Sequence, residues 1–89
     1  MALHAPARLQ IAALLAKVSE MEFAKLRELV QVSDSVLSKH LAALVDEGYV
    51  DLRKAPLGGR QRTWASLTRA GHRALEAHVA ALRAIVAHL

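Results

Sequence analysis

The apolar positions of the chain follow a helical period in four separate stretches. Spacings of three and four residues place side chains on one helix face, and they predict a first helix from about Pro6 to Val18. They predict a second helix of about two turns from Phe23, a third from Asp34 to Glu47 and a long fourth from Arg69 to about His88. Polar residues at the helix ends support these bounds. One of Ser33, Asp34 and Ser35 caps the third helix, Gly48 follows it, and Thr68 caps the fourth.

Alternating polar and apolar residues occur in three shorter stretches. Glu20 to Phe23 predicts a very short strand or extended link. Tyr49 to Lys54 and Arg62 to Leu67 predict two longer strands, separated by the turn sequence from Ala55 to Gly59. The two longer strands are expected to form an antiparallel hairpin, called the wing below.

Composition agrees with a mainly helical, small domain. Among 89 residues, 18 are Ala and 15 are Leu, which favour helices, and three are aromatic. The length allows one small domain with a marginal core. No apolar run is long enough to span a membrane, and the absence of Cys excludes thiolate zinc sites, thiol catalysis and disulfides. We therefore expect a soluble cytoplasmic protein.

The positive charge is concentrated in one segment. Residues 51–73 carry a balance of +5, whereas residues 1–50 carry −1 and residues 74–89 carry none. A localised basic patch indicates a polyanionic partner, with a solvated charged loop as the alternative.

The predicted order of elements is that of a winged helix-turn-helix, with the third helix as the recognition helix. A rotation of 100° per residue places Leu37, Leu41 and Leu44 on its buried side. The opposite side carries Ser35, Lys39, Ala42 and Asp46, with Ser38 on the flank. Such a small, polar face fits a DNA groove better than the alternative of a solvated helix.

The residues from Val32 to Leu41, with Leu44 and Glu47-Gly48-Tyr49-Val50, resemble the recognition segment of bacterial winged-helix regulators of the MarR-like and ArsR-like groups. The segments Gly58–Trp64 and Leu67–Gly71 match the same pattern, so the resemblance covers about residues 8–75. It implies sequence-specific binding of duplex DNA by a homodimer, usually in repression. The chain is shorter than MarR proteins and lacks the Cys of ArsR metal sensors, so it resembles a minimal subgroup with one C-terminal helix.

The resemblance carries two sets of DNA-binding candidates onto this chain. In the recognition helix they are Ser33, Asp34, Ser35, Ser38 and Lys39, although Asp34 is expected mainly to stabilise the helix dipole. In the wing, which would reach phosphates or the minor groove, they are Arg53, Lys54, Gly58, Gly59, Arg60, Gln61 and Arg62.

Apolar residues of the last helix recur at spacings of four and three, as in a coiled-coil seam. We expect homodimerisation through this helix and part of the first, with a monomer whose last helix folds back as the alternative. The candidate interface residues are Leu75, His78, Val79, Leu82, Ile85, Val86, Leu89, Leu9 and Ile11. Residues 1–68 would then be the DNA-binding core and residues 69–89 the dimerisation helix of a single structural domain.

Other residue types give weaker signals. The spacing of His72, His78 and His88 does not form a ligand pair, so we expect no metal site and no cofactor. His40 is expected to pack or to contact a phosphate, and Trp64 to pack in the wing or an interface. No nucleophile–base spacing indicates an enzyme.

The sequence therefore predicts a mainly α, α+β winged-helix protein that regulates transcription, as a repressor, from a near-palindromic operator. The alternative is a winged-helix protein-interaction module without DNA binding. The sequence identifies no small-molecule effector.

Overall fold

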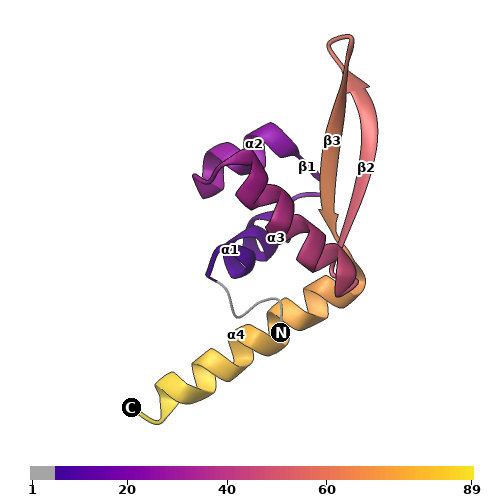
Figure 1. The fold of residues 1–89 in the computed structure, drawn as a ribbon. Coiled ribbons are helices and arrows are strands. Elements are labelled where there is room, and N and C mark those ends of the chain that lie inside the picture. The colour runs from indigo at the N-terminus through magenta and orange to yellow at the C-terminus, as the bar shows by residue number, and fades with distance from the viewer. Residues whose placement is uncertain (1–5) are drawn as a thin grey trace.

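The computed structural model describes residues 6–89, and Figure 1 shows the arrangement of their elements. The expected fold class is confirmed: a three-helix core carries a β-hairpin wing and is followed by a long C-terminal helix. The elements are α1 (Pro6–Leu15), β1 (Met21–Glu22), α2 (Phe23–Val30), α3 (Asp34–Asp46), β2 (Val50–Leu57), β3 (Arg60–Leu67) and α4 (Arg69–Ala87).

The core lies between the first three helices and the base of the wing. Its largest fully buried side chains are Ile11, Leu15, Leu26, Leu37, Leu41, Leu44 and Val50. Each helix contributes residues three or four positions apart, as the apolar period predicts. The core thereby fixes α3 against α1 and α2 and leaves the opposite side of α3 exposed.

The first helix is shorter than the sequence predicts. It ends at Leu15 instead of Val18, because the amides of Lys17 and Val18 bond to the carbonyls of Leu14 and Leu15, three residues back, in a tighter turn. Val18 is consequently 42% exposed and makes no core contribution.

The wing is longer than predicted, and its turn is shorter. The strands β2 and β3 pair from Val50↔Leu67 to Leu57↔Arg60, so the turn consists of Gly58 and Gly59 alone, with φ of +60° and +76°. A two-residue turn with both φ values positive matches strand twist and favours glycine. The sequence analysis places Pro56 in the turn, but it lies in β2, an edge strand in which a missing amide donor is tolerated.

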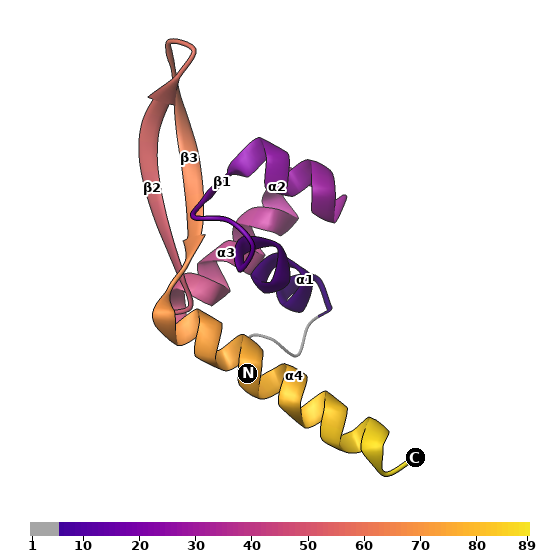
Figure 2. The ribbon, with the colours of Figure 1, turned by 180° about the vertical axis from the view of Figure 1, so that it is seen from behind.

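The predicted short strand is β1, and it extends the wing into a three-stranded sheet of order β1-β3-β2. Met21 pairs with Ala65 and Glu22 with Trp64, both antiparallel. Only the base of the wing gains this third strand, and the rest of the hairpin projects away from the helices (Figures 1 and 2).

The start of α4 is locked to the base of the wing. The Thr68 hydroxyl accepts a bond from Gly71 N (2.9 Å) and donates one to the Gly48 carbonyl (2.6 Å), while Thr68 N bonds to Tyr49 O (2.9 Å). Gly71 is buried where α4 meets the base of the wing, next to Tyr49 and Leu67. The predicted Thr68 cap and the closing segment Leu67–Gly71 therefore form a junction between the wing, the end of α3 and α4.

Beyond its first turns, α4 extends past the core. Figures 1 and 2 show its C-terminal end pointing away from the tip of the wing. The described chain consequently measures 53 × 25 × 21 Å. Ala74 and Leu75 pack against the core, whereas Leu82, Ile85, Val86 and Leu89 are 45–99% exposed.

Candidate nucleic-acid interface

The helix α3 begins at a cap that also determines which polar groups are available there. Ser33 is the N-cap residue, and its hydroxyl accepts a bond from Val36 N (3.2 Å). Its oxygen also lies 3.3 Å from the Ser35 hydroxyl. Asp34 pairs with Arg27 of α2 at 2.9 Å, with both side chains substantially exposed. This places an acidic group at the positive end of the helix dipole, as expected for Asp34.

The outward side of α3 is as the sequence analysis predicts. Ser35, Ser38, Lys39, Ala42 and Asp46 are exposed, and Leu37, Leu41 and Leu44 are buried. The exposed residues of α3 also include Val36, at 39% exposure, which the sequence analysis did not select. Its position on the flank of the helical wheel was the signal that could have identified it. An apolar group there can contact a thymine methyl in a major groove.

His40 packs against the first helix instead of projecting outward. Its Nδ1 accepts a 3.0 Å hydrogen bond from Nε of Arg8, which lies in α1. Burial, together with the nearby Arg8 charge, lowers the pKa of His40 below its ordinary value. Of the two expectations for this residue, packing is thus the one observed. The neutral imidazole ties α3 to α1.

The tip of the wing carries the glycine turn and two exposed polar side chains. Gly58, Gly59, Arg60 and Gln61 are all exposed there, so the predicted tip residues lie together. Within residues 6–89, neither Arg60 nor Lys54 has an ion-pair partner. Trp64 packs within the wing, which is one of the two placements expected for it. Its Nε1 donates a hydrogen bond to Ala55 O at 3.4 Å.

Two wing cations have acidic partners that the sequence analysis does not predict. Arg53 binds Glu20 through two hydrogen bonds, one of them from Nε to Oε2 at 2.7 Å, and Arg62 Nη1 binds Glu22 Oε1 at 2.9 Å. The bond from Arg53 lowers the pKa of Glu20, so the carboxylate stays ionised. Arg53 and Arg62 therefore each pair with an acidic side chain of the same chain.

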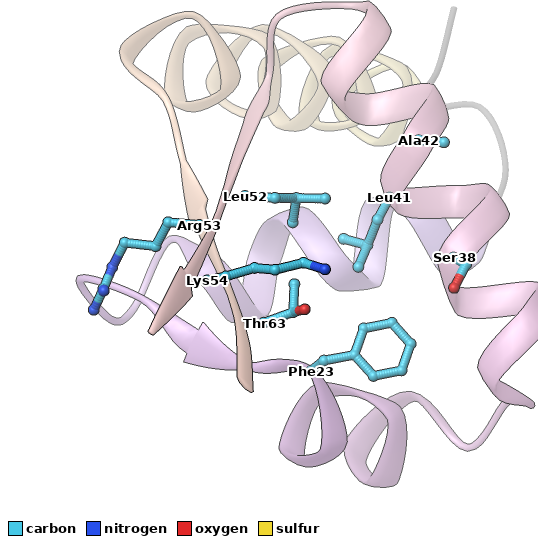
Figure 3. A pocket seen from close by; sticks show the side chains of 8 residues that line it. All are labelled: Phe23, Ser38, Leu41, Ala42, Leu52, Arg53, Lys54 and Thr63. Carbon is cyan, nitrogen blue, oxygen red and sulfur yellow. The ribbon is translucent and has the colours of Figure 1, made fainter. Parts of the chain in front are cut away.

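A cleft of about 340 Å³ separates α3 from the wing. Phe23, Leu41 and Leu52 line its apolar part, and Figure 3 shows the Lys54 side chain pointing into it, while Arg53 points away. The hydroxyls of Ser38 and Thr63 lie on its two sides, on α3 and β3 (Figure 3). The cleft thus aligns an ammonium and two hydroxyls between the recognition helix and the wing. Thr63 and Phe23 were not selected from the sequence, because only the fold brings them beside α3.

The predicted dimer interface divides into two groups. Leu82, Ile85, Val86 and Leu89 are exposed along the projecting part of α4, whereas Leu75, His78, Val79 and Leu9 are half-buried. The prediction that Ile11 lies at the interface is wrong, because its side chain is fully buried in the core of its own chain.

The described part of the chain contains no group of three or more His, Cys, Asp or Glu side chains arranged to hold a metal ion. Over the same residues, none of the helices combines the length and the hydropathy that a bilayer crossing requires.

Three kinds of comparison relate this geometry to known proteins. A family model described as "Winged helix DNA-binding domain" matches residues 7–86. An uncharacterized protein of Methanocaldococcus jannaschii is 32% identical over 72 residues, which cover 81% of this chain and 78% of that protein.

Solved structures that resemble this chain are also those of transcriptional regulators. A transcriptional regulator homologue from Pyrococcus horikoshii OT3 superimposes with a TM-score of 0.91 at 23% identity, covering 98% of this chain and 86% of that one. A MarR family transcriptional regulator from Silicibacter pomeroyi gives a TM-score of 0.76 at 28% identity and covers 98% of this chain. Our chain spans only 57% of that regulator's length.

Proposed function

The chain belongs to the winged helix DNA-binding domain family and is a MarR-like member of it, and on this premise we propose that it represses transcription as a homodimer on a near-palindromic operator. Family and fold are those of DNA-binding transcriptional regulators and not of enzymes. The exposed residues of α3 and α4 support the DNA-binding mode and the homodimer, and repression is inferred from the MarR-like resemblance.

The outward side of α3 is the single observation that carries the DNA-binding mode. Ser35, Ser38 and Lys39 are exposed on it, and the capped start of the helix and the cleft toward the wing lie on either side. A major groove about 12 Å wide admits one α-helix, and short hydroxyl side chains allow a close approach to base edges. We therefore assign base reading to α3 and backbone contact to the wing tip.

The exposed stripe of α4 supports the homodimer. Leu82, Ile85, Val86 and Leu89 project beyond any core surface of their own chain. A contiguous apolar stripe of this kind favours association with a second copy. A two-fold dimer repeats α3 about 34 Å away, which requires a near-palindromic site. In this scheme the chain up to residue 68 reads DNA and residues 69–89 dimerise, within one domain.

Duplex titration at several salt concentrations tests the DNA-binding mode. Lys39→Ala is expected to weaken binding, whereas Lys17→Ala is the charge-matched control, since Lys17 is exposed in the turn after α1, the helix behind α3 (Figure 1). Ser38→Ala is expected to alter the preferred sequence. Equal effects of the two lysine variants would contradict the assignment of α3.

Sedimentation tests the dimer. Leu82→Asp places a charge in the exposed stripe and is expected to give a monomer, whereas Ala77→Asp, on another side of the same helix, is expected to remain dimeric. A dimeric Leu82→Asp variant would refute the proposed interface.

One observation favours a second candidate, a winged helix that binds protein instead of DNA. Glu20 and Glu22 neutralise two of the wing's cations, which makes the wing less basic than its sequence. A mobility shift on duplex of random sequence at low salt separates the two candidates. Retardation supports DNA binding, and its absence supports the protein-interaction module.

A further inference from the structure

The outer face of the three-stranded sheet, on the side away from α3, carries a row of charged side chains around Trp64. Cross-strand partners share a face, so Glu22 of β1 and Arg53 of β2 lie on the same face as Trp64, on either side of it. Arg62 lies on this face too, two residues along β3. The Arg53 guanidinium is 5.8 Å from the centre of the Trp64 ring.

Two carboxylates of the β1 region link this row to the helical core. Glu20 binds Arg53, and Glu22 binds Arg62. Glu22 also uses its second oxygen to accept the amide of Ala24, so that one side chain caps α2 and holds the wing. The Glu22 side chain is only 14% exposed.

The position of these pairs matters because the outer part of the wing has no third strand beside it. β1 pairs with only two residues of β3, Ala65 and Trp64, and the hairpin beyond that point is two-stranded. Arg62 lies just past the end of β1. An isolated two-stranded hairpin is marginally stable and free to bend, so a bond at this point restricts the angle between the wing and α3.

We propose that Glu20 and Glu22 are positioning residues that set the wing angle through Arg53 and Arg62, and that the wing's DNA contacts come from Arg60 and Lys54. This inference rests on the proposed function. It separates the four wing cations into two that hold the wing and two that meet phosphate. Lys54 points into the cleft beside α3 (Figure 3), and Arg60 directly follows the glycine turn at the tip.

Salt-dependent binding to a mixed-sequence duplex of about 30 base pairs, three helical turns, distinguishes the two groups. Arg60→Ala is expected to reduce the slope of log K against log salt by about 0.9, as one lost phosphate contact does. Arg62→Ala is expected to lower the affinity with the slope unchanged. A slope loss of the same size for Arg62→Ala would overturn the proposal, because Arg62 would then contact phosphate.

The carboxylate variants give a test in which the proposal and the change in net charge predict opposite effects on DNA affinity. Glu22→Gln removes a negative charge but keeps an oxygen to cap α2, and it is expected to weaken binding about three- to tenfold, a loss on the scale of one hydrogen-bonded charge. Glu28→Gln, at an exposed site on α2, is the charge-matched control and is expected to bind as well as the wild type or better. Glu20→Gln leaves the α2 cap intact and repeats the test if Glu22→Gln folds poorly.

Hydrogen exchange of the amides of residues 57–61, without DNA, separates this inference from the proposed function. Glu22→Gln is expected to accelerate exchange there, and Glu28→Gln to leave it unchanged. Unchanged exchange and unchanged affinity in Glu22→Gln would overturn the proposal. If the wild type itself bound no duplex, the proposed function would fail, and wing exchange alone would decide whether the carboxylates hold the wing.

Discussion

Gly71, at the junction of α4 with the wing, is a position where a single methyl group is expected to be costly. A Cβ placed on Gly71 would lie 2.6 Å from Leu67 Cδ1 and closer still to the Tyr49 carbonyl oxygen. Carbon atoms in favourable contact are about 3.5–4.0 Å apart. The Tyr49 oxygen cannot easily withdraw, because it accepts the hydrogen bond from Thr68 N that begins α4.

The magnitude of the Gly71→Ala effect follows from two opposing terms. Alanine in a helix interior is favoured over glycine by about 1 kcal/mol. Overpacking costs about 1–3 kcal/mol and more when backbone must move, as it must at Tyr49. We expect a net loss of about 2 kcal/mol, which for a domain of this size lowers Tm by about 10 °C.

Urea denaturation at one fixed protein concentration measures the effect, with the midpoint shifting and the m-value unchanged. Ala77→Gly, at an exposed position of the same helix, is the control and is expected to lose about 1 kcal/mol through helix propensity alone. If Gly71→Ala were instead more stable than the wild type, the close packing at the junction would be refuted.

The remaining predictions concern two local contacts. Because the pKa of His40 is lowered, the unfolded chain binds a proton there before the folded chain does, so stability is full above about pH 7 and falls as the pH drops through the ordinary value of 6.5 toward the lowered pKa. His40→Asn retains an acceptor for Arg8 and is expected to flatten this decline in urea midpoints measured between pH 7.5 and 5.5. His72→Asn, at an exposed site, is the control and is expected to leave the decline unchanged. An unchanged decline in His40→Asn would exclude His40 as the cause of the pH dependence. Ser33→Ala removes the α3 cap and is expected to cost about 1 kcal/mol, read from the same denaturation curves, while a neutral result would show that the cap bond contributes nothing.

Local signals in the sequence were sufficient for most of the fold. The helical period located the buried leucines of α3, and Thr68 and Gly48 marked helix ends because their chemistry acts within a few residues. The outward residues of α3 followed from the same period, since a helix that buries one side must expose the other.

The sequence analysis missed features that arise where distant segments meet. The partners of Arg53 and Arg62 are 33 and 40 residues away in sequence, so no local pattern shows that these cations are paired. Ile11 is apolar, as an interface residue would be, but the packing of α1 against the other helices buries it completely. Pro56 indicated a turn, and only the strand order shows that it lies on an edge where proline is tolerated.

Selection of bound duplexes from a random pool tests the central claim, that α3 and the wing read DNA as a two-fold dimer, most directly. The account predicts an enriched site of two inverted half-sites, with centres about one helical turn of 10–10.5 base pairs apart or a multiple of it. It also predicts that Ser38→Ala or Lys39→Ala changes the enriched half-site. Failure of the wild type to enrich any sequence, or enrichment of a single half-site without symmetry, would contradict it.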